Sequence, residues 1–108
     1  MNDMNQLILE GAVEKAPVIW GGTAEMDIAV SRSFKGMDGN VLEEKSFFTV
    51  KGYENLADIM ISYCPKGRGV RIVGRLKQER WKDSDGKKHS KIVVLAEHID
   101  LKPVKEEK

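Results

Sequence analysis

The chain has 108 residues, of which 41% are hydrophobic and 32% are charged, and its formal net charge at pH 7 is +1. This length suffices for one domain with its own core but not for two, and no apolar run approaches the roughly 18–20 residues of a membrane span. The N-terminus lacks the basic and apolar regions of a signal peptide, so we expect a cytoplasmic protein with no membrane partner.

The first part of the chain predicts two strands. Leu7–Val13 is mostly apolar with a bend at Gly11, and Pro17 limits how far this strand can pair. Residues 23–31 alternate between apolar and polar, which is the pattern of a half-buried strand. Its core side would consist of Ala24, Met26, Ile28 and Val30. Turn formers in residues 34–40 then indicate a loop or hairpin tip.

The middle of the chain predicts a third strand and one short helix. Residues 45–52 alternate, with Phe48 as the expected core residue and Phe47 as the expected surface ring. From Glu54 to Cys64 the apolar spacing changes to three and four residues, which indicates an amphipathic helix stopped by the following proline. The buried side of that helix would consist of Leu56, Ile59, Met60 and Tyr63, with Cys64 as a buried hydrophobe at its end.

Residues 70–94 predict two more strands, joined by an Asp-Gly turn within residues 82–87. If the first of them is extended, its successive side chains point to opposite sides. One side would carry Arg71, Val73, Arg75, Lys77, Glu79 and Trp81. The other side would face the core with Val70, Ile72, Gly74 and Leu76.

This order of elements is five strands with one helix between the third and the fourth. It is the order expected of an OB-fold, a partly open Greek-key barrel, although periodicity alone leaves other small α+β arrangements open. We therefore predict an all-β protein with one short helix, a five-stranded OB-fold (Greek-key barrel) over residues 1–102. Residues 103–108 would form a short charged tail.

Charge is distributed unevenly along the chain. Residues 1–31 have a net charge of −4, residues 32–91 of +6 and residues 92–108 of −1. A charge run alone is more often a solvated face, but here the cations share a strand face with Trp81. Such a face suits a polyanion that carries exposed flat rings, and single-stranded nucleic acid is the commonest ligand of that kind.

The sequence contains no set of residues that indicates catalysis. His89 and His98 have no cysteine or paired carboxylate at metal-ligand spacing, so we expect surface or packing roles for both. The single cysteine, Cys64, excludes an internal disulfide and a multi-cysteine zinc site. No phosphate-binding glycine motif and no nucleophile–base set is evident. We expect a protein that is not an enzyme and that needs no metal or cofactor.

Several segments match one known family in order and spacing. They are MNQLILEG, GTAEMDIAVSRSF, YENLADI, KGRGVRIVGRL and the W-x-D-x-x-G turn that begins at Trp81. From Met4 to about Leu101 the chain resembles the bacterial and mitochondrial single-stranded DNA-binding protein (SSB) family, which exemplifies binding of bases on aromatic stacking platforms. The resemblance implies an OB-fold that binds single-stranded DNA without strong sequence preference and protects it during replication, recombination or repair.

The resemblance also implies a set of site residues. Base-stacking positions carry over to Phe34, Phe47, Tyr53 and Trp81, with shifted spacing around Tyr53. Trp20 lies where the family commonly has an aromatic, and it could line the groove or pack on a loop. We expect phosphates to be neutralised by Arg32, Lys35, Lys51, Arg71, Arg75, Lys77 and Arg80.

Partners and location follow from the same resemblance. It implies a homo-oligomer located with the nucleoid in the cytoplasm, a tetramer by resemblance, while a dimer stays open. The sequence ends at KEEK without the family's acidic tail, so recruitment of replication proteins through such a tail is not supported. Two alternatives stay open: an accessory factor of replication restart like the primosomal replication protein PriB, and an OB-fold protein-interaction module. RNA also stays open as a ligand, because stacking is blind to the 2′-hydroxyl.

Overall fold

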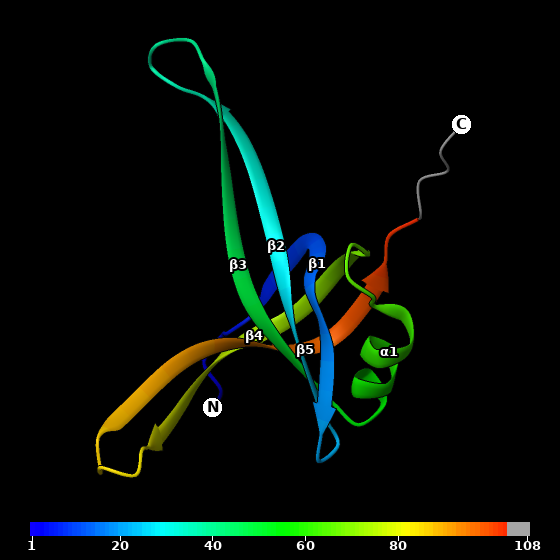
Figure 1. Cartoon of the computed structure of the whole chain (residues 1–108), viewed down its shortest axis with the longest axis vertical. Coiled ribbons are helices and arrows are strands. Elements are labelled where there is room, and N and C mark those ends of the chain that lie inside the picture. The colour runs from blue at the N-terminus through cyan, green and yellow to red at the C-terminus, as the bar shows by residue number, and fades with distance from the viewer. Residues whose placement is uncertain (104–108) are drawn as a thin grey trace.

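The computed structural model describes residues 1–103 and has the predicted order of elements (Figure 1). They are β1 (Leu7–Trp20), β2 (Thr23–Lys35), β3 (Val41–Tyr53), α1 (Asn55–Tyr63), β4 (Gly69–Lys82) and β5 (Lys88–Leu101). Within the described residues, no helix is long and apolar enough to cross a membrane. The predicted charged tail lies, from residue 104 onward, outside the described residues.

The five strands form a closed barrel in the order β1-β2-β3-β5-β4. β3 and β5 pair in parallel, whereas the other neighbouring strands pair antiparallel. α1 lies between β3 and β4 in the chain and packs against the barrel, as Figure 1 shows. The predicted all-β, five-stranded OB-fold with one short helix is therefore confirmed.

The barrel core is built from the strand sides that alternation predicts. Ala24, Met26 and Ile28 of β2 are at most 1% exposed, and Val70 and Ile72 of β4 are fully buried. Successive strand residues point to opposite sides, so an apolar residue at every second position identifies the side that faces the core. α1 adds its own buried residues to this core, namely Ala57, Met60 and Cys64. Burial also raises the pKa of the Cys64 thiol.

The core prediction is wrong for two residues, and both lie on the parts of β3 and β4 that project beyond the barrel. Phe48 is 38% exposed and Leu76 is 47% exposed. β5 pairs with β3 only at Val50 and Lys51, and β1 pairs with β4 no further than Gly74. Beyond those points each strand has only its hairpin partner in the sheet, although the Asn5 side chain still bonds to the Leu76 backbone. No third strand therefore covers the side that faces the core elsewhere.

The projecting ends also explain why the strands are longer than predicted. β2 and β3 stay paired from Thr23–Tyr53 out to Lys35–Val41, so only residues 36–40 form the hairpin tip. Figure 1 shows this β2–β3 hairpin and the β4–β5 hairpin projecting from the barrel in different directions. Away from the core both faces of a ribbon meet water, so apolar alternation is lost there while backbone pairing continues.

The prediction of the buried side of α1, a stripe of apolar residues along the helix, is partly wrong. Tyr63, the last residue of the helix, is exposed, although its spacing from Met60 suggested burial. The buried residues Ala57, Met60 and Cys64 place the stripe slightly further round the helix. A helix of 9 residues leaves its ends uncovered more easily than a long one, so periodicity locates its stripe only approximately.

β1 is irregular where Pro17 interrupts it. Its register against β2 shifts between Val13 and Lys15 and again between Lys15 and Val18. Proline has no N–H to donate to the ladder, which is why it occurs at bulges and edges. Pro17 limits pairing as predicted, but pairing resumes at Val18 and continues to Trp20.

Gly11 provides a test of the packing between β1 and β2. A Cβ at this position would collide with the carbonyl oxygen of Ala29, which belongs to backbone and cannot rotate away. We predict that Gly11→Ala lowers the free energy of unfolding by about 1–3 kcal/mol in urea denaturation at fixed protein concentration. The control is Gly36→Ala, whose Cβ would come close to the movable side chains of Asp38 and Leu42 at 3.1 and 3.2 Å and would meet the Asn40 carbonyl oxygen at an ordinary contact distance of 3.5 Å. Equal losses in both variants would contradict this reading of the barrel packing.

Candidate nucleic-acid interface

The outer side of the barrel brings the cationic face of β4 close to β3, with β5 between the two strands. The Lys77 Nζ lies 6.0 Å from the centroid of the Tyr53 ring. Lys51 Nζ donates to both carboxylate oxygens of Glu79, at 2.9 and 2.7 Å. The predicted alternation of β4 therefore holds along this face, because Lys77 and Glu79 point outward while Val70 and Ile72 are buried.

Trp81 lies on the β4–β5 hairpin and is 47% exposed. It pairs across the ribbon with His89, and the two rings stack with centroids 5.5 Å apart at an interplanar angle of 19°. The structure thus presents this indole outside the barrel core, as the sequence predicts. His89 packs on the tryptophan, within the surface or packing role expected for it.

The phenylalanines lie on the other projecting hairpin. Phe47 is opposite Ala29, and it belongs to the same outward-facing set of β3 residues as Lys51 and Tyr53. Phe34 lies near the hairpin tip, with the Arg32 guanidinium carbon 5.6 Å from its ring centroid. The register of this ribbon is unbroken, so Phe34 and Phe47 project to opposite faces. The structure groups Phe47 with Tyr53 but sets Phe34 apart, and Trp81 is on a different hairpin (Figure 1).

Three of the predicted phosphate-binding cations already have polar partners. Lys51 is held by Glu79, with side chains only 17% and 24% exposed, and this hydrogen bond raises the pKa of Lys51. Arg71 pairs with Glu10 of β1 at 2.9 Å. Arg80 donates to the Gln78 side chain at 2.8 Å.

Arg75 and Lys77 differ from these cations. Both are exposed on β4, and neither has an ion-pair partner among residues 1–103. Lys35 is likewise exposed, at the end of β2. An exposed cation without a carboxylate partner can neutralise a phosphate without first breaking an ion pair. Arg75 and Lys77 are therefore the best placed of the predicted cations on the β3–β4 face.

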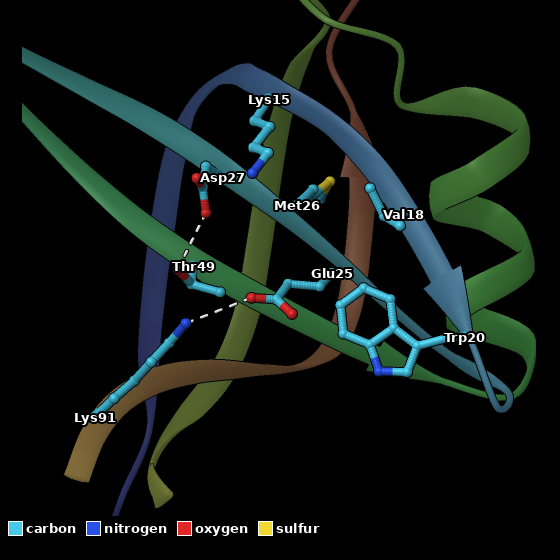
Figure 2. Close-up of a pocket in the computed structure, with 8 residues that line it drawn as sticks. All are labelled: Lys15, Val18, Trp20, Glu25, Met26, Asp27, Thr49 and Lys91. Atoms are coloured by element: carbon cyan, nitrogen blue, oxygen red, sulfur yellow. Dashed lines mark hydrogen bonds and ion pairs between the residues drawn. The ribbon is translucent and has the colours of Figure 1, made fainter. Parts of the chain in front are cut away.

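A pocket lies where β1 is irregular, as Figure 2 shows. Trp20 forms one of its walls, so this residue lines a pocket rather than packing on a loop. Lys91 of β5 reaches Glu25 at 3.4 Å, and Thr49 Oγ1 donates to Asp27 at 3.0 Å. The complete lining consists of Lys15, Val18, Trp20, Glu25, Met26, Asp27, Thr49 and Lys91.

Most of this pocket cannot be predicted from the sequence alone. Alternation places Glu25 and Asp27 on the polar side of β2, but it does not tell which strand lies beside them. Lys91 meets Glu25 only because the barrel closes between β3 and β5. In the described part of the chain, no group of three or more His, Cys, Asp or Glu residues could hold a metal ion.

The barrel order, with one helix between β3 and β4, defines an OB-fold protein. A family model described as "Single-strand binding protein family" matches residues 4–102. The chain belongs to the single-strand binding protein family.

Bacterial single-stranded DNA-binding proteins are among its relatives. It is 36% identical to the single-stranded DNA-binding protein of Aquifex aeolicus (strain VF5) over 103 residues, which cover 91% of this chain and 69% of that protein. It is 37% identical to the single-stranded DNA-binding protein of Helicobacter pylori (strain ATCC 700392 / 26695) over 78 residues, which cover 72% of this chain and 44% of that protein. The chain therefore matches about two thirds of the first relative and under half of the second.

Solved structures share the fold. The Plasmodium falciparum SSB in complex with ssDNA superposes with a TM-score of 0.77 at 20% identity, covering 94% of this chain and 95% of that one. A deletion mutant of the single-stranded DNA-binding protein from Thermus aquaticus gives a TM-score of 0.72 at 27% identity, covering 93% of this chain and 51% of that one.

The Lys51–Glu79 ion pair leads to a prediction about stability. We predict that Glu79→Gln lowers the free energy of unfolding by about 1–2 kcal/mol at pH 8, because the pair is largely shielded from water. The folded state raises the pKa of Lys51, so this contribution is present below the unfolded lysine value of about 10.4 and is lost as pH rises through the raised value.

Urea denaturation of wild type and variant at pH 8 and at pH 11 measures this difference. Glu10 provides the control, because it pairs with Arg71 and Lys102 through side chains that are about half exposed, so Glu10→Gln should change stability less than Glu79→Gln does. A difference between wild type and Glu79→Gln that stays constant up to pH 11 would contradict the assignment.

Proposed function

We propose that this chain binds single-stranded DNA with little sequence preference, by stacking bases on exposed aromatics and neutralising phosphates with nearby cations. The observation that carries the proposal is the outer face of β3 and β4, where Lys77 lies beside Tyr53 and Trp81 follows on the same side of the strand. Membership of the single-strand binding protein family supports it. So do the names of the relatives and of the Plasmodium falciparum complex.

The proposed site has a centre and two extensions. Tyr53, Phe47 and Trp81 would stack bases at the centre, with Arg75 and Lys77 beside them to bind phosphates. The first extension is the β2–β3 hairpin, which would contribute Arg32, Phe34 and Lys35. The second is the pocket beside Trp20. Lys51, Arg71 and Arg80 stay candidates from the sequence, but each would first have to break its present ion pair or hydrogen bond to bind a phosphate.

The biological role and the assembly belong to the same proposal. Binding of this kind would protect single strands during replication, recombination or repair. We propose a homo-oligomer, a tetramer by resemblance, and the exposed apolar side chains of Leu76 and Ile92, on one face of the β4–β5 ribbon, support an assembly that covers them. Light scattering tests the assembly, because a monomer would overturn it and a dimer would favour the PriB-like alternative.

Replacement of Trp81 tests the stacking part of the proposal. We predict that Trp81→Ala weakens binding of labelled oligo(dT) by about 1–3 kcal/mol, measured by fluorescence anisotropy. The free energy of unfolding should change little, because the side chain lies outside the core. The matched control is Tyr63→Ala, which removes another exposed ring from a helix away from the β3–β4 face. Equal affinity of wild type and Trp81→Ala would contradict the assignment.

The salt dependence of binding tests the phosphate contacts. We predict that Lys77→Gln reduces the slope of log K against log salt concentration by about 0.7, the value for one phosphate contact on a single strand. The control is Lys66→Gln, an exposed cation between α1 and β4 that lies outside the proposed site. Competition with duplex DNA and with RNA in the same assay defines the ligand. A protein that ignores single-stranded DNA would instead fit an interaction module.

A further inference from the structure

The end of the β4–β5 hairpin holds an arrangement that the stacking proposal does not use. Trp81 and His89 face each other across the two strands, with ring centroids 5.5 Å apart and planes only 19° from parallel. The imidazole therefore covers one face of the indole. A base that stacks on Trp81 has only the opposite face available.

The imidazole is itself tied to the turn. His89 Nε2 lies 2.8 Å from Asp83 Oδ2, while the other carboxylate oxygen of Asp83 accepts the N–H groups of Asp85 and Lys87, both at 2.9 Å. The bond with His89 and the bonds with the turn backbone lower the pKa of Asp83, so it stays a carboxylate near neutral pH. Because a carboxylate only accepts, Nε2 of His89 is the donor in this hydrogen bond.

Charged groups of both signs surround His89. The hollow next to Trp81 and His89 is lined also by Gln78, Arg80, Lys82, Lys88 and Ser90. Asp83 is the acid in contact with the imidazole, and Asp85 lies further along the turn. On the same face of the ribbon, the cross-strand pair Glu79 and Lys91 is next to the pair Trp81 and His89. A phosphate bound in this hollow would add negative charge near His89 and so favour the imidazolium in the complex.

We infer that Asp83 and His89 are positioning residues for Trp81: they hold the indole as a one-sided stacking platform, and DNA binding there is coupled to protonation of His89. The inference rests on the proposed function, since the coupling requires a bound strand. The complex then holds more protons on His89 than the free protein does. By linkage, affinity rises as pH falls through the range in which histidines titrate.

Three variants separate positioning from a purely structural role. His89→Ala removes the stack and the proton, and His89→Phe keeps a flat ring against Trp81 but cannot be protonated. The matched control is His98→Phe, because His98 also pairs with an aspartate, Asp100, at 3.0 Å but has no tryptophan against it. Circular dichroism checks that each variant is folded.

The first measurement is the affinity for labelled oligo(dT) at pH 6 and pH 8 in the same salt. Wild type and His98→Phe should bind at least about threefold more tightly at pH 6 than at pH 8, less than the tenfold per pH unit that one proton allows. The affinity of His89→Phe at pH 8 should be within about twofold of the wild-type affinity. Its affinity should not rise from pH 8 to pH 6 as the wild-type affinity does. His89→Ala should bind about 2- to 10-fold more weakly at pH 8, the range of one aromatic pair. Wild-type pH dependence in His89→Phe would overturn the coupling.

The second measurement needs no DNA. The chain has two tryptophans, so Trp20→Phe leaves Trp81 as the only emitter. Its emission should fall as pH is lowered from 8 to 6, because a stacked imidazolium quenches indole, and His89→Phe should abolish this change. If the wild-type protein fails to bind oligo(dT) but its emission still changes with pH, the proposed function is overturned. The His89–Trp81 pairing stands in that case. Emission that does not respond to pH overturns the pairing itself.

Discussion

The closure between β3 and β5 is the contact on which the rest of this structure depends. These strands meet in parallel at Val50 with Val94 and at Lys51 with Leu95. Val50 and Val94 enter the core, and closing the sheet removes the free edges that an open sheet would expose. Because the closure is so short, the outer lengths of β2–β3 and β4–β5 continue as two separate ribbons (Figure 1). One contact thus determines both the barrel and its projecting arms.

Closure also sets the electrostatics of the outer face. It places β5 between β3 and β4, which lets Lys51 meet Glu79 and Lys77 meet Tyr53. Carboxylates on or beside this face hold two of its cations, Lys51 and Arg71, in ion pairs with Glu79 and Glu10. Stacking of bases on aromatic rings discriminates weakly between bases, which agrees with the proposed binding with little sequence preference.

The β4–β5 hairpin shows how a ribbon without a core can still hold a side chain in place. A two-stranded ribbon is marginally stable by itself in water. Here a cross-strand ring stack and the hydrogen bonds of one turn aspartate provide order where no barrel packing reaches. The β2–β3 hairpin uses a related device, since a guanidinium lies over the Phe34 ring. Aromatic residues on both arms are therefore held by neighbours that are close in the sequence.

Alternation and turn residues were enough to predict the element order, the core side of β2 and β4 and the outward direction of Lys77 and Trp81. They failed for Phe48 and Leu76, which face the core direction but lie past the strand neighbours that would cover them. The side to which a strand residue points is a property of the local backbone, so the sequence determines it. Whether that side is buried, and which charge it meets, depends on the distant strand beside it, and only closure of the barrel decides that.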